Sequence, residues 1–538
     1  MKDKMKYVLV MVSFGLVLYF MAGFSSARQG LPSVEERVYG VSQIWKRASD
    51  HYALWKLADT EPSWDEAYEI AYEEAVNAKT SKEYYLVLKK FLAHLHDGHA
   101  EGVSTYKGMV TKYMLPFLME YRNSQYVIVQ TANVHANKFP LGAVVKTIDG
   151  VETGKYLEEV WGEYVGLLTS GARQQQLCNL FLYAGEKGEK ITVELLGPGQ
   201  TETKRQTATW AEIGSKYQKQ SYHINGESVY TSEAFEVKVL EEDIFYVNFR
   251  TQQDLAYIDE WFEEVTPLLA ECKGIILDVR SNGGGNSMVG HTILESFVGE
   301  PIAYCSSAPD TMKVSSFVNN FAFWDSYMEL AADRENLSQA EQIQRTLDHV
   351  KEMNDTEFEA MLEIGAEMYQ GRFELSAEME ELLMKEIQKQ YPDMAQADIL
   401  EATKESAYKE LVENSPLIGK NVVLLIGHNS GSATDSMAAE AKAAGFPLVG
   451  TRTKGATGNV LAIDAGGGWK VGISTQRSLT PEGIDINNIG VEADVFVEQS
   501  EQDALNHVDT QVETAVEVLL REGGAVDGEK SRLAERIE

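Results

Sequence analysis

The sequence contains little cysteine, and this scarcity excludes two classes of protein. Cysteine occurs only at Cys178, Cys272 and Cys305 among 538 residues. Three thiols allow at most one disulfide, too few for a disulfide-scaffolded fold, and they lack the paired spacing of a zinc site. Proline is also scarce, with 12 residues, whereas 44% of the chain is hydrophobic. This composition favours packed domains over a disordered or fibrous chain.

Basic residues are the second shortage. The chain has 48 lysines and arginines against 82 aspartates and glutamates, which gives a formal net charge of −34. Such a surface repels the phosphates of nucleic acids and the headgroups of anionic lipids. We therefore expect no nucleic-acid partner, and contact with a membrane only through the N-terminal segment.

The N-terminal segment is apolar enough to direct export. Three lysines precede the uncharged stretch Tyr7–Phe24, which reads YVLVMVSFGLVLYFMAGF. Its length lies between a long signal-peptide core and a minimal membrane span. Cleavage after Ala27 would release the protein, whereas an uncut segment would anchor it with a cytoplasmic N-terminus. Residues 1–30 thus predict an exported protein, either secreted or anchored in the cell envelope.

The length of the chain predicts about three to four folded units. Apolar spacings of three and four predict helices as far as Leu95, short strands separated by glycine turns follow, and strands then alternate with helices. This last pattern is typical of an α/β core with parallel strands. An acidic segment with helical periodicity interrupts that core. The predicted units are a helical module at 31–104, a β-rich domain at 105–212, a core at 213–314 and 416–522, a helical insertion at 315–415 and a charged tail at 523–538.

A polar turn and an alanine-rich helix follow the buried strand that begins at Val422. Ser432 should lie at the N-terminus of this helix, where backbone N–H groups lack intrahelical partners and the helix dipole favours negative charge. A serine in this position is either an N-cap or a nucleophile whose oxyanion the free N–H groups stabilise. Neither Ser430 nor Ser432 stands in a Gly-x-Ser-x-Gly elbow.

The stretch Asp278–Gly285, DVRSNGGG, follows another buried strand. Its glycines let the backbone approach a bound group closely or adopt positive φ angles. No Gly-Lys-Ser/Thr follows, and the dinucleotide pattern is incomplete, so neither type of phosphate-binding loop is indicated.

Four features together resemble one family, the C-terminal processing (tail-specific) peptidases, whose wider membership includes the tricorn core protease and retinoid-binding repeats. They are the turn LHDGH at Leu95–His99, the β-rich region, which resembles a PDZ domain, DVRSNGGG, and SATD at Ser432–Asp435. The resemblance implies a ClpP/crotonase-like α/β peptidase core with a PDZ-like domain. It further implies a Ser432 nucleophile, an oxyanion hole formed by the N–H groups of Gly284 and Ala433, and cleavage of peptides or proteins.

The general base is where the sequence departs from the family. The processing peptidases usually place a lysine in T-x-G-K-G, but here the matching stretch is TKGATG and Ala456 occupies the lysine position. Lys454 is the less favoured alternative. The tricorn-like branch uses a histidine in the upstream turn, which corresponds to His99. An unperturbed histidine pKa of about 6.5 suits a base near neutral pH. His94, His96 and His428 are rival histidines.

Two further questions remain open at the level of sequence. A third residue should orient the histidine, and Asp485, Asn487 and Glu482 are the candidates near the corresponding strand.

We expect a serine endopeptidase or processing peptidase that requires no metal or organic cofactor and that could be oligomeric. The alternatives are a non-catalytic protein of the same fold that binds a peptide or a lipophile, and an esterase or amidase.

Overall fold

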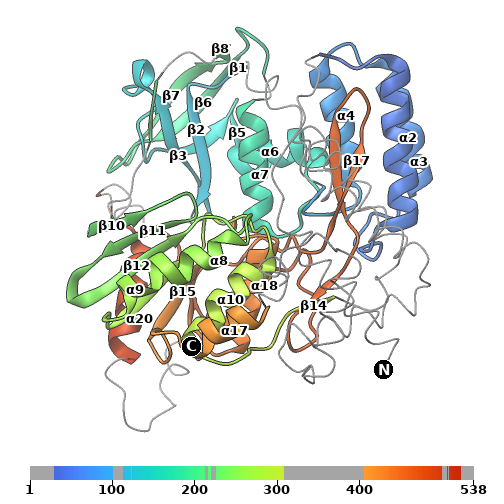
Figure 1. The fold of residues 1–538 in the computed structure, drawn as a ribbon. Coiled ribbons are helices and arrows are strands. Elements are labelled where there is room, and N and C mark those ends of the chain that lie inside the picture. Colours follow the sequence, from blue (N-terminus) through green and yellow to red (C-terminus); the bar gives the residue numbers. More distant parts are fainter. Residues whose placement is uncertain are drawn as a thin grey trace, which may run out of the picture.

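The computed structural model describes residues 30–100, 113–307, 405–499 and 506–522, except for positions 123, 184, 213–215, 220–223, 225 and 507 (Figure 1). The predicted signal or anchor, the insertion before residue 405 and the charged tail lie outside the described residues. None of the helices within these ranges is long and apolar enough for a membrane span.

The bounds of the helices follow. They are α2 (Val34–His51), α3 (Trp64–Asn77), α4 (Ser81–Ala93), α6 (Thr153–Trp161), α7 (Ser170–Leu182), α8 (Ala256–Glu260), α9 (Thr266–Leu269), α10 (Ser287–Val298), α17 (Glu405–Glu413), α18 (Ala433–Ala443) and α20 (Thr510–Glu522).

The bounds of the strands follow. They are β1 (Tyr113–Met114), β2 (Phe117–Arg122), β3 (Gln125–Ala132), β4 (Val144–Ile148), β5 (Val151–Glu152), β6 (Lys190–Leu196), β7 (Thr203–Thr209), β8 (Ala211–Glu212), β9 (Tyr217–Lys219), β10 (Glu227–Thr231), β11 (Phe235–Val239), β12 (Ile244–Phe249), β13 (Gly274–Asp278), β14 (Ser306–Ser307), β15 (Val422–Ile426), β16 (Leu448–Gly450), β17 (Val460–Asp464), β18 (Lys470–Ser474), β19 (Ser478–Leu479) and β20 (Val495–Phe496).

A seven-stranded sheet in the order β10-β11-β12-β13-β15-β16-β20 forms the α/β core. Strands from β12 to β20 pair in parallel, which confirms the predicted α/β class. Side chains alternate across the sheet: Ile275 and Leu277 face the cluster that includes α10 and α18, whereas Ile276 faces α20. Helices thus cover both faces, and residues that follow β13 and β15 emerge at the same edge.

A second sheet, in the order β2-β3-β4-β6-β7, is antiparallel and packs against α6 and α7. Figure 1 shows α6 and α7 beside this sheet, with the α/β core below them. β2 is an edge strand, and Gln175 of α7 covers part of that edge because its Oε1 accepts the Tyr121 N–H at 3.2 Å. The sheet is therefore partly closed by its own helix on the side nearest the core.

The N-terminal helices α2, α3 and α4 share a hydrophobic core with the β17–β18 hairpin. Their capping residues are those that the sequence favours, because Ser33 and Ser63 form capping boxes with Glu36 and Glu66. The hairpin joins them from far along the chain: the Tyr84 hydroxyl donates to the Ala465 carbonyl oxygen at 2.6 Å. This contact brings a segment of the predicted core domain against the helical module, which the sequence pattern does not reveal.

Candidate active site

Ser432 lies on a strained turn between β15 and α18. Its φ of 57° and ψ of −123° fall in a region that side-chain-bearing residues rarely adopt. Such strain is maintained only where surrounding contacts fix it, and it commonly marks functional sites. The turn therefore has the strand-turn-helix form of a nucleophile elbow, although the sequence lacks the Gly-x-Ser-x-Gly pattern.

The glycine-rich loop after β13 lies directly against this turn. The Ser430 hydroxyl donates to the Val279 carbonyl oxygen at 2.8 Å, and the Gly431 N–H donates to the Asn282 carbonyl oxygen at 3.3 Å. Gly284 has φ +98°, and a Cβ added there would lie 2.8 Å from the Ser432 Cβ. Glycine is thus required at position 284 for both its backbone conformation and its close approach.

Backbone N–H groups near Ser432 differ in whether they already donate a hydrogen bond within the protein. The Gly284 N–H donates to Asn282 Oδ1 at 2.9 Å. Within the described residues, the Gly283 and Ala433 N–H groups have no hydrogen-bond acceptor. Gly283 also lines the cavity in front of Ser432. These two groups are therefore free to donate to a bound oxygen.

The structure brings His99 to Ser432. His99 Nε2 lies 3.2 Å from Ser432 Oγ, and its Nδ1 lies 2.8 Å from the hydroxyl of Ser474. Ser474 lies at the end of β18 and donates to Asp97 Oδ1 at 2.8 Å. Asp97 is 2% exposed and also accepts the His99 N–H at 3.0 Å. A continuous chain of polar contacts therefore runs from Ser432 through His99 and Ser474 to Asp97.

This chain determines the tautomer of the histidine. A carboxylate only accepts hydrogen bonds, so Ser474 donates to Asp97 and can accept a proton from His99 Nδ1. Nε2 of the neutral ring is then left to accept from Ser432. Burial, together with the nearby charge of Lys454, lowers the pKa of His99 from its usual value, although Asp97 acts in the opposite direction. The neutral ring is consequently favoured near pH 7.

Asp435 holds the nucleophile turn to the segment at 453–456. Its carboxylate accepts the N–H groups of Ser432 at 2.9 Å, Gly455 at 2.8 Å and Ala456 at 3.0 Å. Complete burial raises its pKa to about 6, against the lowering effect of these hydrogen bonds. Asp435 thus has a positioning role close to the reaction centre.

Ala456 and Lys454 both line the cavity that contains Ser432. A Cβ added to Gly98 would lie 2.4 Å from the Ala456 Cβ, so the turn that carries His99 packs directly on this position. Lys454 lines the cavity, and its ammonium donates to the Gly98 carbonyl oxygen at 3.4 Å. The cation is near the site and acts on its electrostatics.

Two of the rival histidines, His94 and His96, lie in other surroundings. His96 contacts the Gly166 carbonyl oxygen and Asp59, each at 2.8 Å, and His94 stacks on Trp64. His428 lines the cavity beside Ser432. Burial lowers the pKa of both His94 and His428.

The predicted orienting residues support the site from further away. Asn487 donates to Asp485 Oδ1 at 2.8 Å and accepts the Thr457 hydroxyl at 2.5 Å. The Thr457 carbonyl oxygen in turn accepts from Ser474 at 3.3 Å. Glu482 is at a loop position between β19 and β20. The groups that directly follow His99 are instead Ser474 and Asp97.

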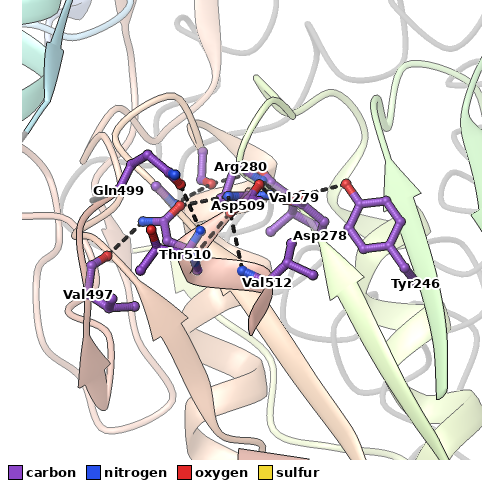
Figure 2. Close-up of polar contacts among 12 residues, drawn as sticks. Tyr246, Asp278, Val279, Arg280, Val497, Gln499, Asp509, Thr510 and Val512 are labelled. Atoms are coloured by element: carbon purple, nitrogen blue, oxygen red, sulfur yellow. Dashed lines mark hydrogen bonds and ion pairs between the residues drawn. The ribbon is translucent and has the colours of Figure 1, made fainter. Parts of the chain in front are cut away.

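The arginine of the DVR stretch holds the segment after β13 to the start of α20 (Figure 2). Arg280 donates to Asp509 at 3.0 and 2.8 Å through its two terminal nitrogens, and its Nε donates to Asp278 at 3.0 Å. Tyr246 donates to the same Asp278 carboxylate at 2.7 Å, and Gln511 accepts from Arg280 at 2.7 Å. This cluster connects β13 to α20.

The cavity at Ser432 has a volume of about 110 Å³. Besides the residues named above, it is lined by Ala172, Gln175 and Gln176 of α7 and by Asn429. Nowhere in the described ranges are three His, Cys, Asp or Glu side chains grouped as metal ligands would be. The arrangement therefore supplies an alcohol, an adjacent base and free N–H donors, which are the functional groups that acyl transfer requires.

Comparisons with known proteins support a serine peptidase. Residues 243–497 match peptidase family S41, and no curated protein sequence matches the chain. Mature CPAF superposes with a TM-score of 0.58 at 15% identity, covering 92% of this chain and 99% of that one. The tricorn protease has a TM-score of 0.37 at 15% identity and covers 91% of this chain and 37% of its own. The photosystem II D1 C-terminal processing protease has a TM-score of 0.37 at 16% identity, with 86% and 93% covered. The likeness to mature CPAF shows the fold.

Sequence reasoning overlooked Ser474 and Asp97. Asp97 stands inside the LHDGH turn, two residues before His99, and could have been found by asking which acid is nearest to the base. Ser474 carries no comparable signal, because a serine at the end of a short strand is common and only the hairpin packing brings it to His99.

Proposed function

We propose that this chain, whose residues 243–497 match peptidase family S41, hydrolyses peptide bonds through an acyl-enzyme on Ser432, with His99 as the general base. The observation that carries this proposal is the 3.2 Å contact between His99 Nε2 and Ser432 Oγ. A nucleophile and base within hydrogen-bond reach, with the base itself oriented, is the arrangement that activates a serine.

The reaction follows from these contacts. His99 Nε2 accepts the Ser432 proton as the oxygen attacks the peptide carbonyl carbon. The protonated ring then donates that proton to the leaving amine, and an ester to Ser432 remains. Water, deprotonated by His99, hydrolyses the ester and restores the serine. Throughout, Ser474 and Asp97 stabilise the positive charge on the imidazolium.

We assign the oxyanion donors to the N–H groups of Ala433 and Gly283. The resemblance implied Gly284 in the second role, but that N–H is bonded to Asn282 Oδ1. Ala433 begins α18, so the helix dipole adds to its effect. Loss of one such donor typically costs about 10²- to 10³-fold in kcat.

A fluorophosphonate probe and casein hydrolysis test the proposal. Wild-type protein should be labelled and should cleave casein, whereas Ser432→Ala should do neither and His99→Ala should lose both by at least about 10³-fold. Ser228→Ala, an exposed serine on β10, is the matched control and should behave as wild type. Labelling or cleavage that persists in Ser432→Ala would refute the assignment.

The competing proposal of a lipophile-binding protein finds little support at this site. Pockets for drug-sized ligands are about 300–1,000 Å³, well above the 110 Å³ in front of Ser432. Turnover of a small ester without any peptide cleavage would instead identify an esterase.

We propose a role for α7 in admitting the substrate. Ala172, Gln175 and Gln176 line the catalytic cavity, and Gln175 also covers the β2 edge. A substrate tail that pairs with β2 would compete with Gln175 and bear on the helix that lines the cavity. If this PDZ-like region captures C-termini, a peptide with a free carboxylate should be cleaved faster than its C-terminal amide. Equal rates would contradict this role.

The N-terminal segment supports a proposal on location. Residues 1–30 should direct export, so their fusion to alkaline phosphatase, which is active only outside the bacterial cytoplasm, should give activity. Fusion of a variant with Leu16→Arg and Val17→Arg should not. Equal activity of the two fusions, or none from either, would contradict export by this segment.

A further inference from the structure

Gln252 is a fully buried polar residue that the mechanism above does not use. It follows β12 by three positions, belongs to none of the motifs, and is 0% exposed. A buried amide must satisfy both its donor and its acceptor, because leaving either unpaired is costly. The hydrogen-bond partners of Gln252 therefore show which segments it connects.

The backbone of Gln252 is bonded to the glycine-rich loop. Its N–H donates to the Gly284 carbonyl oxygen at 3.1 Å, and its carbonyl oxygen accepts the Asn286 N–H at 2.7 Å. Gly285, between these two, has φ +142°, and a Cβ there would lie 2.3 Å from the Gln252 carbonyl carbon. The loop is thus fixed against the backbone of Gln252.

The side chain of Gln252 reaches the nucleophile helix. Nε2 donates to the Thr434 hydroxyl at 2.9 Å, and Oε1 accepts the Gly290 N–H in the first turn of α10 at 3.1 Å. Thr434 is the second residue of α18, two positions after Ser432. A Cβ on Gly290 would lie 2.6 Å from Gln252 Oε1, so this contact also requires glycine.

We propose that Gln252 is a positioning residue that sets the separation between the Gly283 oxyanion donor and Ser432. One residue is bonded through its backbone to the donor loop and through its amide to the nucleophile helix. The bonds of Ser430 and Gly431 join the same two segments elsewhere, so Gln252 supplies a second, independent connection. Two connections fix the separation of the donor loop and the nucleophile helix, whereas a single connection would let them rotate relative to each other.

This role matters because oxyanion stabilisation depends steeply on distance. Donors act when they lie about 2.7–3.1 Å from the developing oxyanion, and a displacement of about 1 Å can cost about 10²-fold in rate. The inference rests on the proposed function, since it assumes that Ser432 is acylated.

The test is the rate of fluorophosphonate labelling, together with kcat and KM for casein cleavage. Gln252→Met keeps the length of the side chain but removes both amide bonds, and Thr434→Val removes the acceptor from the other end. Each should label about 10- to 100-fold more slowly and lose kcat with little change in KM. Because both variants break one contact, the double variant should be little slower than Gln252→Met alone.

Two controls separate positioning from a general loss of stability. Thr434→Ser keeps the hydroxyl and should restore the labelling rate to within about threefold of wild type. Thr266→Val removes a buried hydroxyl of α9 that is bonded to the Phe262 carbonyl oxygen, and should lower Tm without slowing labelling. Rates are compared well below the Tm of each variant.

The outcomes distinguish this inference from the proposed function. Absence of labelling in the wild type, or labelling that survives Ser432→Ala, refutes both. Wild-type labelling at Ser432 with an equal rate in Gln252→Met or Thr434→Val refutes the inference alone. Slowing in Thr434→Ser as great as in Thr434→Val would also overturn it, because the hydroxyl would then not be the relevant group.

Discussion

Two buried polar networks meet the loops of the candidate active site, and they differ in how they distribute charge. The cluster at Arg280 joins one cation to two carboxylates, Asp278 and Asp509, in direct contact. The chain at His99 has one carboxylate, Asp97, and a neutral hydroxyl separates it from the imidazole. The first arrangement fixes its charges permanently, whereas the second lets the ring gain and lose a proton.

The electrostatics of each network follow from this difference. Burial alone would raise the pKa of Asp278, but the adjacent Arg280 holds it below its usual value. In contrast, burial lowers the pKa of His99, with only partial opposition from Asp97 through the intervening serine. A base must be neutral before it reacts and charged afterwards, so an indirect carboxylate suits it. We therefore expect the Arg280 cluster to determine stability and the His99 chain to determine rate.

The largest expected effect is on stability, from Asp509→Ala. Asp509 is 4% exposed, and its removal breaks a buried ion pair, which typically costs about 3–5 kcal/mol. Urea unfolding should report this loss, while kcat of the folded enzyme stays within a few fold of wild type. Asp243→Ala, which removes an exposed pair with Lys273, should cost less than about 1 kcal/mol. A fall in kcat of about 100-fold, which is the effect expected below for Ser474→Ala, would remove the distinction between the networks.

Ser474→Ala should lower kcat strongly, in contrast to Asp509→Ala, which should mainly lower stability. The change leaves His99 Nδ1 without its acceptor and separates Asp97 from the ring, so kcat should fall by about 100-fold. Ser296→Ala is the control, because this buried serine is bonded to Trp261 far from the active-site loops. It should lower Tm without changing kcat. If Ser474→Ala retains wild-type kcat, the chain does not orient the base.

These two networks also show what the sequence could and could not predict. Hydrophobic runs and turn residues identify β13, β15 and α18, and the order of the motifs identifies Ser432 and His99 as partners. Such signals are local, because each depends on residues that are neighbours in the chain. Ser474 and Asp509 instead reach the site through tertiary packing, of β18 against the N-terminal helices and of α20 against the sheet.

The dependence on local signals also explains why the predicted orienting residue and the predicted second oxyanion donor differ from the groups found in the structure. The family pattern places the orienting acid near Asn487, whereas in the structure Asp97, two residues before His99, is the acid connected to the base through Ser474. The resemblance implies Gly284 as an oxyanion donor, yet the direction of a backbone N–H depends on φ and ψ, which the residue type alone does not fix. Positive φ at Gly284 is visible only in the structure.

A third cluster sharpens the comparison, since its cation can titrate. His291 lies between Glu440 and Glu295 at 3.0 and 3.1 Å and is 1% exposed. Although burial opposes it, these carboxylates raise the pKa of His291 to about 9. The folded pKa lies above the unfolded value of about 6.5, so the stabilisation is complete below pH 6.5 and is lost as pH rises through 9.

The loss should be on the order of 2 kcal/mol between pH 6.5 and 9.5, measured by urea unfolding of wild type against His291→Gln. The variant should lack this part of the pH dependence. The Arg280 cluster should contribute nothing to it, because an arginine stays charged throughout this range. A wild-type curve parallel to that of His291→Gln would mean that His291 is not charged in the folded protein.

The smallest expected effect distinguishes the two candidate bases. Burial, with a smaller contribution from the nearby Lys454 cation, lowers the pKa of His99, so activity should rise with pH through a midpoint below 6.5 in the wild type. Lys454→Ala removes this cation, and the midpoint should move to higher pH while kcat at pH 8 stays within about threefold. Lys273→Ala, an exposed lysine, should leave the midpoint unchanged. A loss of 100-fold or more at pH 8 in Lys454→Ala, with activity retained in His99→Ala, would identify the lysine as the base. The His99 chain would then be a structural network like that at Arg280, and the contrast between the two would no longer hold.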